Sequence, residues 1–154
     1  MITTKFESLS EMKNFLGKEI GVSDWFQITQ KQINAFGKVT FDEQWIHTNP
    51  EKAKKNSPYG EPIAHGFLIL SLIPKFLTET ISFANVKMGI NYGMDKVRFM
   101  NATPVNARIR ARITLAEVSE ISGGVKYKTE VVLELENVEK PACYAEMIAI
   151  MLVE

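Results

Sequence analysis

The sequence predicts an α+β fold in which a long antiparallel sheet wraps around a central apolar helix. Residues 65–83 are apolar on nearly all sides of a helix, which is typical of a helix buried in a core. From residue 88 onward the chain alternates apolar and polar residues in long β-branched runs. A single buried helix followed by consecutive strands indicates a sheet with its helix packed on one face.

The elements before the central helix are expected to be short. Residues 7–17 carry apolar positions at helical spacing and finish on Gly17, a residue that commonly ends a helix. Residues 21–29 alternate well enough to predict a strand. Thr29 is suited to cap a helix that follows over residues 30–40.

The middle of the chain changes from polar to strongly apolar. Residues 42–62 are interrupted by prolines and a glycine, which predicts a loop with one helical turn at residues 50–55. Within the apolar run, Pro74 is expected to kink the helix or to end its first half. The strands are expected at residues 88–99, 107–120, 124–138 and 142–154. A sheet of this kind around one helix is the hot dog arrangement.

Composition narrows the class of protein. A chain of 154 residues fits one domain, spanning residues 1–154, and 18 basic residues balance 18 acidic ones, so no nucleic-acid partner is expected. The single cysteine, Cys143, precludes an intrachain disulfide and is expected to be a buried small hydrophobe. The N-terminus has no signal-peptide pattern, and no run approaches a membrane span of about 20 residues. We therefore expect a cytoplasmic protein with no membrane partner.

The candidate chemistry is concentrated around the only two histidines, His47 and His65. Asp42 lies five residues before His47, and a carboxylate beside an imidazole can position a water molecule and exchange its proton. His65 is followed by Gly66 at the start of the apolar helix, where unpaired backbone N–H groups stabilise negative charge. The sequence thus predicts that residues 42–66 supply an acid, a base and an electrophilic group for one site.

Each of these residues also has an ordinary structural interpretation. Asp42 alone is typical of a turn or cap, and His47 alone of a partly buried hydrogen-bonding group. His65 is expected to fix the loop or cap the helix. Two histidines and one aspartate could in principle bind a metal, but no paired ligand spacing supports it, so no metal is expected. Gly93 breaks the alternation of its strand and favours a β-bulge or a close contact between helix and sheet.

Three runs, DEQWIHTNPEKA, GEPIAHGFLILSL and INYGMDKVRF, resemble the MaoC-like dehydratases of the hot dog superfamily, which include R-specific enoyl-CoA hydratases and NodN-like proteins. The resemblance extends from about Trp25 to the C-terminal strand. It implies that Asp42 and His47 are catalytic and that the Gly66 N–H holds a thioester carbonyl. It also implies an acyl-CoA or acyl-carrier-protein thioester substrate and no metal or organic cofactor.

The chain departs from the R-hydratase pattern Asp-x-Asn-Pro-x-His, because Gln44 and the following tryptophan replace the Asn-Pro pair, as in the NodN-like branch. The residues predicted to contact substrate are Gln44, His65, Phe67 and Ser71. Ser71 is a candidate for the hydroxyl that supports the aspartate in some relatives, since Pro74 stands near the matching position.

The resemblance also implies a homodimer or a higher homo-oligomer with sheets joined edge to edge. Two other functions stay open. A hot dog thioesterase commonly needs a carboxylate on the central helix, where the first acidic residue here is the late Glu79. A non-catalytic acyl-thioester-binding protein would have no need of the acid–base pair.

Overall fold

The computed structural model describes residues 1–153, apart from the side chain of Leu9, and its main feature is a curved sheet of six strands. The order in the sheet is β2-β6-β7-β8-β5, with β3 pairing to β6. The long strands pair antiparallel, as the sequence predicts: β6, β7 and β8 pair in chain order, and β5 pairs with β8. The strands are β2 Glu19–Val22, β3 Phe26–Gln27, β5 Val86–Phe99, β6 Arg108–Ile121, β7 Gly124–Leu135 and β8 Val138–Val153.

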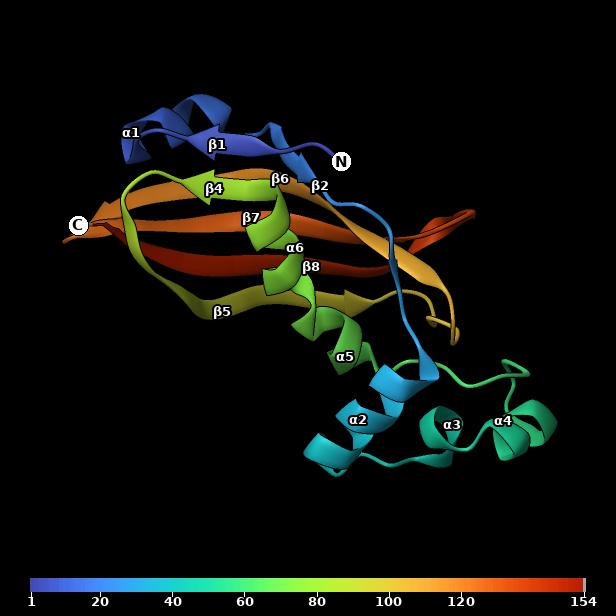
Figure 1. Cartoon of the computed structure of the whole chain (residues 1–154). Helices are drawn as coiled ribbons and strands as arrows, with labels where there is room; N and C mark the ends of the chain where they lie inside the picture. Colours follow the sequence, from blue (N-terminus) through green and yellow to red (C-terminus); the bar gives the residue numbers. More distant parts are fainter. Residues whose placement is uncertain (154) are drawn as a thin grey trace.

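The central helix crosses one face of this sheet in two pieces, α5 Gly66–Ser71 and α6 Ile73–Thr80 (Figure 1). The break falls at Leu72, and Pro74 occupies the first turn of α6, where its missing N–H costs no helical hydrogen bond. The predicted break at Pro74 is therefore confirmed. Ile73 and Phe76 are completely buried against the sheet. This helix within a sheet is the predicted hot dog fold.

The predicted helix extends too far at its C-terminal end. Ile81–Phe83 form a strand, β4, which pairs in parallel with β1, Thr4–Phe6. A short apolar run fits a buried strand as well as the end of a buried helix, and periodicity cannot separate the two. The partner strand lies far away in the sequence, so the pairing has no local signal.

Strands β6 and β5 differ in how closely the burial of their side chains follows the sequence pattern. In β6, Ile109, Ala111, Ile113 and Leu115 are fully buried, while the arginines between them lie on the outer face and pair with acidic residues. In β5, by contrast, nearly every residue is exposed, and within the described chain this strand pairs with β8 alone at an edge of the sheet. A register shift between Asn91 and Gly93 confirms the predicted bulge.

The N-terminal elements are shorter than predicted. The helix expected over residues 7–17 is one turn, α1 Leu9–Met12, followed by a 3₁₀ turn at Lys13–Phe15. The strand expected over residues 21–29 is divided into β2 and β3, because Ser23 between them turns its hydroxyl to the Ala111 N–H.

Three helices gather at one end of the sheet, next to α5 (Figure 1). Helix α2, Gln30–Thr40, matches the prediction, and Thr29 forms a complete capping box at its start. The predicted loop contains two helices, α3 Trp45–Thr48 and α4 Pro50–Asn56, so more of it is helical than expected. No helix among residues 1–153 is long and apolar enough to cross a membrane.

Candidate active site

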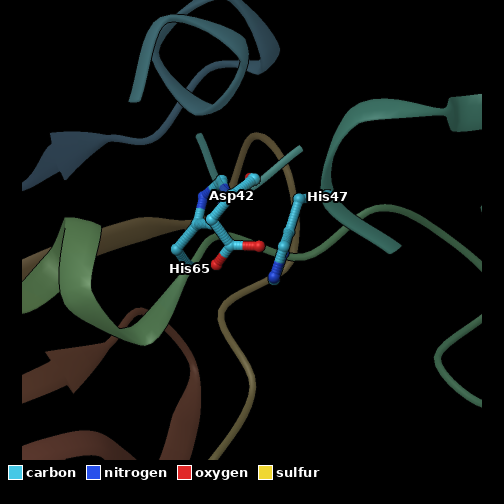
Figure 2. Close-up of side chains that lie close together, drawn as sticks. All are labelled: Asp42, His47 and His65. Atoms are coloured by element: carbon cyan, nitrogen blue, oxygen red, sulfur yellow. The ribbon is translucent and has the colours of Figure 1, made fainter. Parts of the chain in front are cut away.

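Three segments bring Asp42, His47 and His65 together (Figure 2). Asp42 follows α2, where Phe41 takes a left-handed conformation with φ 61° and reverses the chain. His47 belongs to α3, and His65 directly precedes α5. One ligand atom from each of the three side chains lies within 4.8 Å of the others. The predicted grouping of Asp42 with His47 is thus present, and His65 joins it.

His47 is held in one orientation by a hydrogen bond from its ring to the backbone. Its Nδ1 lies 2.6 Å from the carbonyl oxygen of Ile63, so Nδ1 carries the proton and Nε2 keeps a free lone pair. The residue is 7% exposed. Burial is the largest effect and lowers the pKa of His47; the hydrogen bond to Ile63 opposes it, and the smaller effects of His65 and Asp42 respectively lower and raise the pKa. Neutral His47 is therefore available as a proton acceptor at neutral pH.

His65 fixes the loop that carries Asp42. Its Nε2–H donates to the backbone oxygen of Asp42 over 2.8 Å, as the structural interpretation of the sequence expected. Its ring is buried and stacks on His47 with centroids 3.9 Å apart. Among the described residues its Nδ1 has no hydrogen-bond partner. His65 thus positions both the aspartate and the other histidine.

The space between Asp42 and His47 suits a shared water molecule. No direct hydrogen bond joins the two side chains in the part of the chain that the structure describes. Two hydrogen bonds of about 2.8 Å to one tetrahedral water span roughly 4.6 Å, and the ligand atoms of this cluster lie no more than 4.8 Å apart. One water can therefore bond to both groups.

The same three side chains form a possible metal-ligand set, but the ring geometry does not favour it. The planes of His47 and His65 are inclined by only 28°. The nitrogen lone pairs lie in the ring planes, so nearly parallel stacked rings direct them side by side instead of toward one ion at bonding distance. The arrangement favours proton exchange over metal coordination.

A cavity of about 430 Å³ opens beside this cluster. His47 and Gly66 both line it, so two of the three predicted catalytic residues face the same space. Among residues 1–153 no acceptor takes the Gly66 N–H, which stands at the start of α5. A side chain at Gly66 would lie 3.0 Å from the Phe99 ring, so glycine also leaves the approach to this N–H open. The remaining lining residues are Tyr59, Ile63, Ala64, Ile69, Phe99, Met100, Asn101, Ala102 and Thr103.

Comparison with known proteins shows the family of this chain. The family model described as MaoC like domain matches residues 11–137. The chain belongs to the MaoC-like domain family. It is 42% identical over 144 residues to 3-hydroxyacyl-thioester dehydratase Z of Mycobacterium tuberculosis, covering 93% of this chain and 95% of that one. It is 39% identical over 153 residues to nodulation protein N of Rhizobium leguminosarum, covering 94% and 91%.

A solved structure shares the fold. The R-hydratase of Pseudomonas aeruginosa in its unliganded form superposes with a TM-score of 0.70 at 18% identity, covering 90% of this chain and 83% of the other. The predicted resemblance to MaoC-like dehydratases and NodN-like proteins is confirmed by these findings, and so is the hot dog fold.

Three other predicted site residues of this MaoC-like protein lie outside the lining of the cavity. Gln44 is exposed at the start of α3. Phe67 is 67% exposed, with its ring against Phe99. The hydroxyl of Ser71 donates to the backbone oxygen of Leu68 over 2.7 Å on the exposed side of α5. Their contact with substrate remains a prediction.

Sequence reasoning missed Gly37, which lets α2 pack closely against the MaoC-like site. A Cβ there would lie 2.9 Å from the backbone oxygen of Asp42 and 3.5 Å from Cε1 of His65. A glycine inside a helical pattern is a signal of such close approach. The buried Thr103, whose hydroxyl has no partner among the described residues, was also missed because its place in the cavity wall depends on a distant pairing with Ala64.

Replacing Gly37 with alanine is expected to reduce turnover by about tenfold or more, because a misplacement near 1 Å can cost on the order of 100-fold. The methyl group must push away the carbonyl oxygen that His65 holds. Steady-state kinetics would measure the loss, and Gly93→Ala in β5 is the control, because a methyl group there meets no atom within 4 Å and the backbone is not in the left-handed region. Unchanged kinetics of Gly37→Ala would show that the loop position is not critical.

Proposed function

We propose that the protein is a hydro-lyase that adds water to trans-2-enoyl thioesters and, in reverse, dehydrates (R)-3-hydroxyacyl thioesters. One observation carries the proposal: a neutral buried His47, a nearby Asp42 and the unpaired N–H of Gly66 meet at the edge of one cavity. The similarity to 3-hydroxyacyl-thioester dehydratase Z across nearly the whole chain supports the same reaction class.

The reaction places a hydroxyl on C3 and a proton on C2 of the acyl chain. Asp42 and His47 hold one water between them, and the Nε2 lone pair of His47 accepts its proton as the oxygen bonds to C3. The electron pair of the C2–C3 double bond shifts toward the thioester carbonyl, whose oxygen gains negative charge. The protonated pair then delivers a proton to C2, so that one water is added in total.

The Gly66 N–H stabilises the charge that develops on the thioester oxygen. A preorganised backbone donor in a water-poor site strengthens as charge develops, and losing one such donor in other enzymes costs about 3 kcal/mol in the barrier. His65 takes no proton in this scheme. It keeps the Asp42 loop and the His47 ring in place through its own hydrogen bond and its stacking.

Two alternatives are less well supported. A thioesterase needs a group that directs water onto the thioester carbonyl, and the one acidic residue of α5 and α6, Glu79, is paired with Lys75 away from the cavity. A purely binding protein would gain nothing from a buried histidine with a free lone pair beside a carboxylate.

The proposal is tested with a short enoyl thioester and the two enantiomers of its hydrated product. We expect the enoyl absorbance of crotonyl-CoA to fall on adding the protein. We also expect (R)-3-hydroxybutyryl-CoA, but not the S enantiomer, to be dehydrated. Release of free CoA instead would indicate a thioesterase. Binding without either reaction, also with longer enoyl chains, would indicate the binding protein.

The pH dependence of hydration follows from the buried His47. Because burial lowers its pKa from the usual 6.5, the neutral form of His47 predominates at pH 6.5, and the protonated form predominates only in more acidic solution. We expect kcat/KM for hydration to stay high through pH 6.5 and to fall below it. A pH profile of crotonyl-CoA hydration measures this limb, and an acidic limb centred above 6.5 would contradict the role of neutral His47 as base.

We also propose that the chain is a single domain over residues 1–154 and that the protein is cytoplasmic. We further propose that it forms at least a homodimer, with β5 at the interface. The free edge of β5 and the exposed Met88, Ile90, Tyr92 and Met94 on this strand support the dimer, since an exposed apolar edge invites strand pairing. Fractionation of cells tests the location.

Placing a charge in the β5 edge is expected to separate the subunits. Ile90→Glu should lower the mass in solution to that of a monomer, because pairing two β5 strands would bring like charges together. Sedimentation of the native and variant proteins measures the change. Val39→Glu, at an apolar residue on α2 that is 72% exposed, is the control and should sediment like the native protein. A monomeric native protein would contradict the dimer.

A further inference from the structure

A second cavity of about 640 Å³ adjoins the reaction cavity at the end of β5. The two cavities share Phe99 and Met100 in their linings. Beyond this shared wall, the second cavity is lined by three cationic residues, Lys96, Arg98 and Lys140. A positively charged space thus begins where the space beside His47 and Gly66 ends.

The basic cluster, Lys96, Arg98 and Lys140, carries more positive charge than the carboxylate beside it can balance. Within residues 1–153 none of the three forms an ion pair. Lys96 lies over the ring of Tyr144, 5.5 Å from its centre, opposite Glu146 in the strand register. That carboxylate accepts a hydrogen bond from the Tyr144 hydroxyl but keeps its negative charge, so it balances Lys96 and leaves the charges of Arg98 and Lys140. One guanidinium nitrogen of Arg98 bonds to the Val97 carbonyl, which leaves its other donors free.

The arginines of β6 differ in this respect. Arg108 pairs with Glu136, and Arg110 and Arg112 share Glu134. The positive charges of these three arginines are therefore balanced by carboxylates of the same sheet. Of the arginines on β5 and β6, Arg98 is the one whose charge is free for a ligand in the described structure.

A third cavity, of about 450 Å³, adjoins the reaction cavity on another side and provides a comparison. It shares Tyr59, Asn101 and Ala102 with the reaction cavity. Its cation is Arg108, which Glu136 of the same lining neutralises. The second and third cavities both share lining residues with the reaction cavity. Of these two, the second cavity, which holds the basic cluster, is therefore the one with unbalanced positive charge.

We infer that the basic cluster binds the phosphate groups of coenzyme A when the protein holds an acyl-CoA thioester. Lysine and arginine bind phosphate through charge-assisted hydrogen bonds, and the guanidinium of Arg98 can contact two oxygens at once. With the thioester at Gly66, the pantetheine arm passes Phe99 and Met100 to reach the cluster. The inference rests on the proposed function and adds the site that recognises the carrier of the acyl group.

The test compares two thioesters of the same acyl group, crotonyl-CoA and crotonyl-N-acetylcysteamine, of which the second has no phosphate. Arg98→Gln and Lys140→Gln are each expected to lower kcat/KM for crotonyl-CoA by about tenfold, mainly through KM, since a hydrogen bond to a charged group is lost. The loss for crotonyl-N-acetylcysteamine should stay below about twofold, because that substrate does not reach the cluster. Added salt should weaken the native preference for the CoA substrate.

Arg108→Gln is the matched control, because it removes one arginine charge from the third cavity. It should not reduce use of the CoA substrate selectively. Equal losses of Arg98→Gln on both substrates, no loss on either, or a selective loss in Arg108→Gln instead would each overturn the inference. A loss seen only with an acyl-carrier-protein substrate would also overturn it and would assign the cluster to a protein partner.

Binding of free CoA separates this inference from the proposed reaction. Isothermal titration of CoA into the native protein and into Arg98→Gln requires no turnover. Weaker binding by about tenfold in the variant supports the phosphate site even if crotonyl-CoA is not hydrated. Equal binding by both proteins overturns it even if hydration is rapid.

Discussion

Replacing Asp42 with asparagine is expected to lower kcat for crotonyl-CoA hydration by about 10³-fold, which is about 4 kcal/mol in the barrier. Asparagine has nearly the shape of aspartate but cannot take up a proton or stabilise the charged form of His47. Its backbone oxygen still accepts the hydrogen bond from His65, so the loop should keep its place. KM should change little, because Asp42 does not line the cavity.

The control for Asp42→Asn is the neighbouring exposed carboxylate, Glu43. Glu43→Gln removes the same charge one residue away and should change kcat by less than about twofold. Because Asp42 is also exposed, both variants should unfold at nearly the temperature of the native protein. Turnover by Asp42→Asn within about threefold of native would remove Asp42 from the reaction.

Replacing His47 with asparagine should have an effect of similar size for a separate reason. The asparagine amide nitrogen can occupy the position of Nδ1 and keep the hydrogen bond to the Ile63 carbonyl. The variant then lacks only the outer part of the ring, including the Nε2 lone pair. We expect kcat to fall by about 10³-fold with modest loss of stability, measured by steady-state kinetics and thermal unfolding.

His47→Gln is the companion to this variant. Its amide reaches the position of Nε2 but cannot act as a base near neutral pH, so it should be as inactive as His47→Asn. If the glutamine variant retained more than about a tenth of native kcat, the hydrogen bond at this position would matter more than proton transfer. The proposed role of His47 as base would then be wrong.

Much of the site could be predicted because its residues come from one continuous stretch. Asp42, His47 and Gly66 are separated by short segments whose turn and cap residues were visible, so their convergence had a local cause. Pro74 likewise predicted the break between α5 and α6. The alternation of β6 indicated its buried face because one side of the sheet packs on the helix.

The features of the fold and of the site that the sequence did not predict depend mainly on contacts between distant segments. The strand at residues 81–83 exists because β1 pairs with it, and no nearby residue signals that pairing. Gly37 and Thr103 reach the site only through packing of α2 and of the segment after β5. Ser71 was chosen because it lies near the position of a supporting hydroxyl in the sequences of some relatives. The direction of its side chain is set by the rotation of α5, which turns it to solvent.

The central claim is that Asp42 and His47 act together on one water held between them. The most direct measurement is the rate of crotonyl-CoA hydration by the native protein, by Asp42→Asn, by His47→Asn and by the double variant. Groups that act as one unit are strongly non-additive. We predict that the double variant is at most severalfold slower than the slower single variant. Losses that multiply, or native protein that does not hydrate the thioester at all, would contradict the claim.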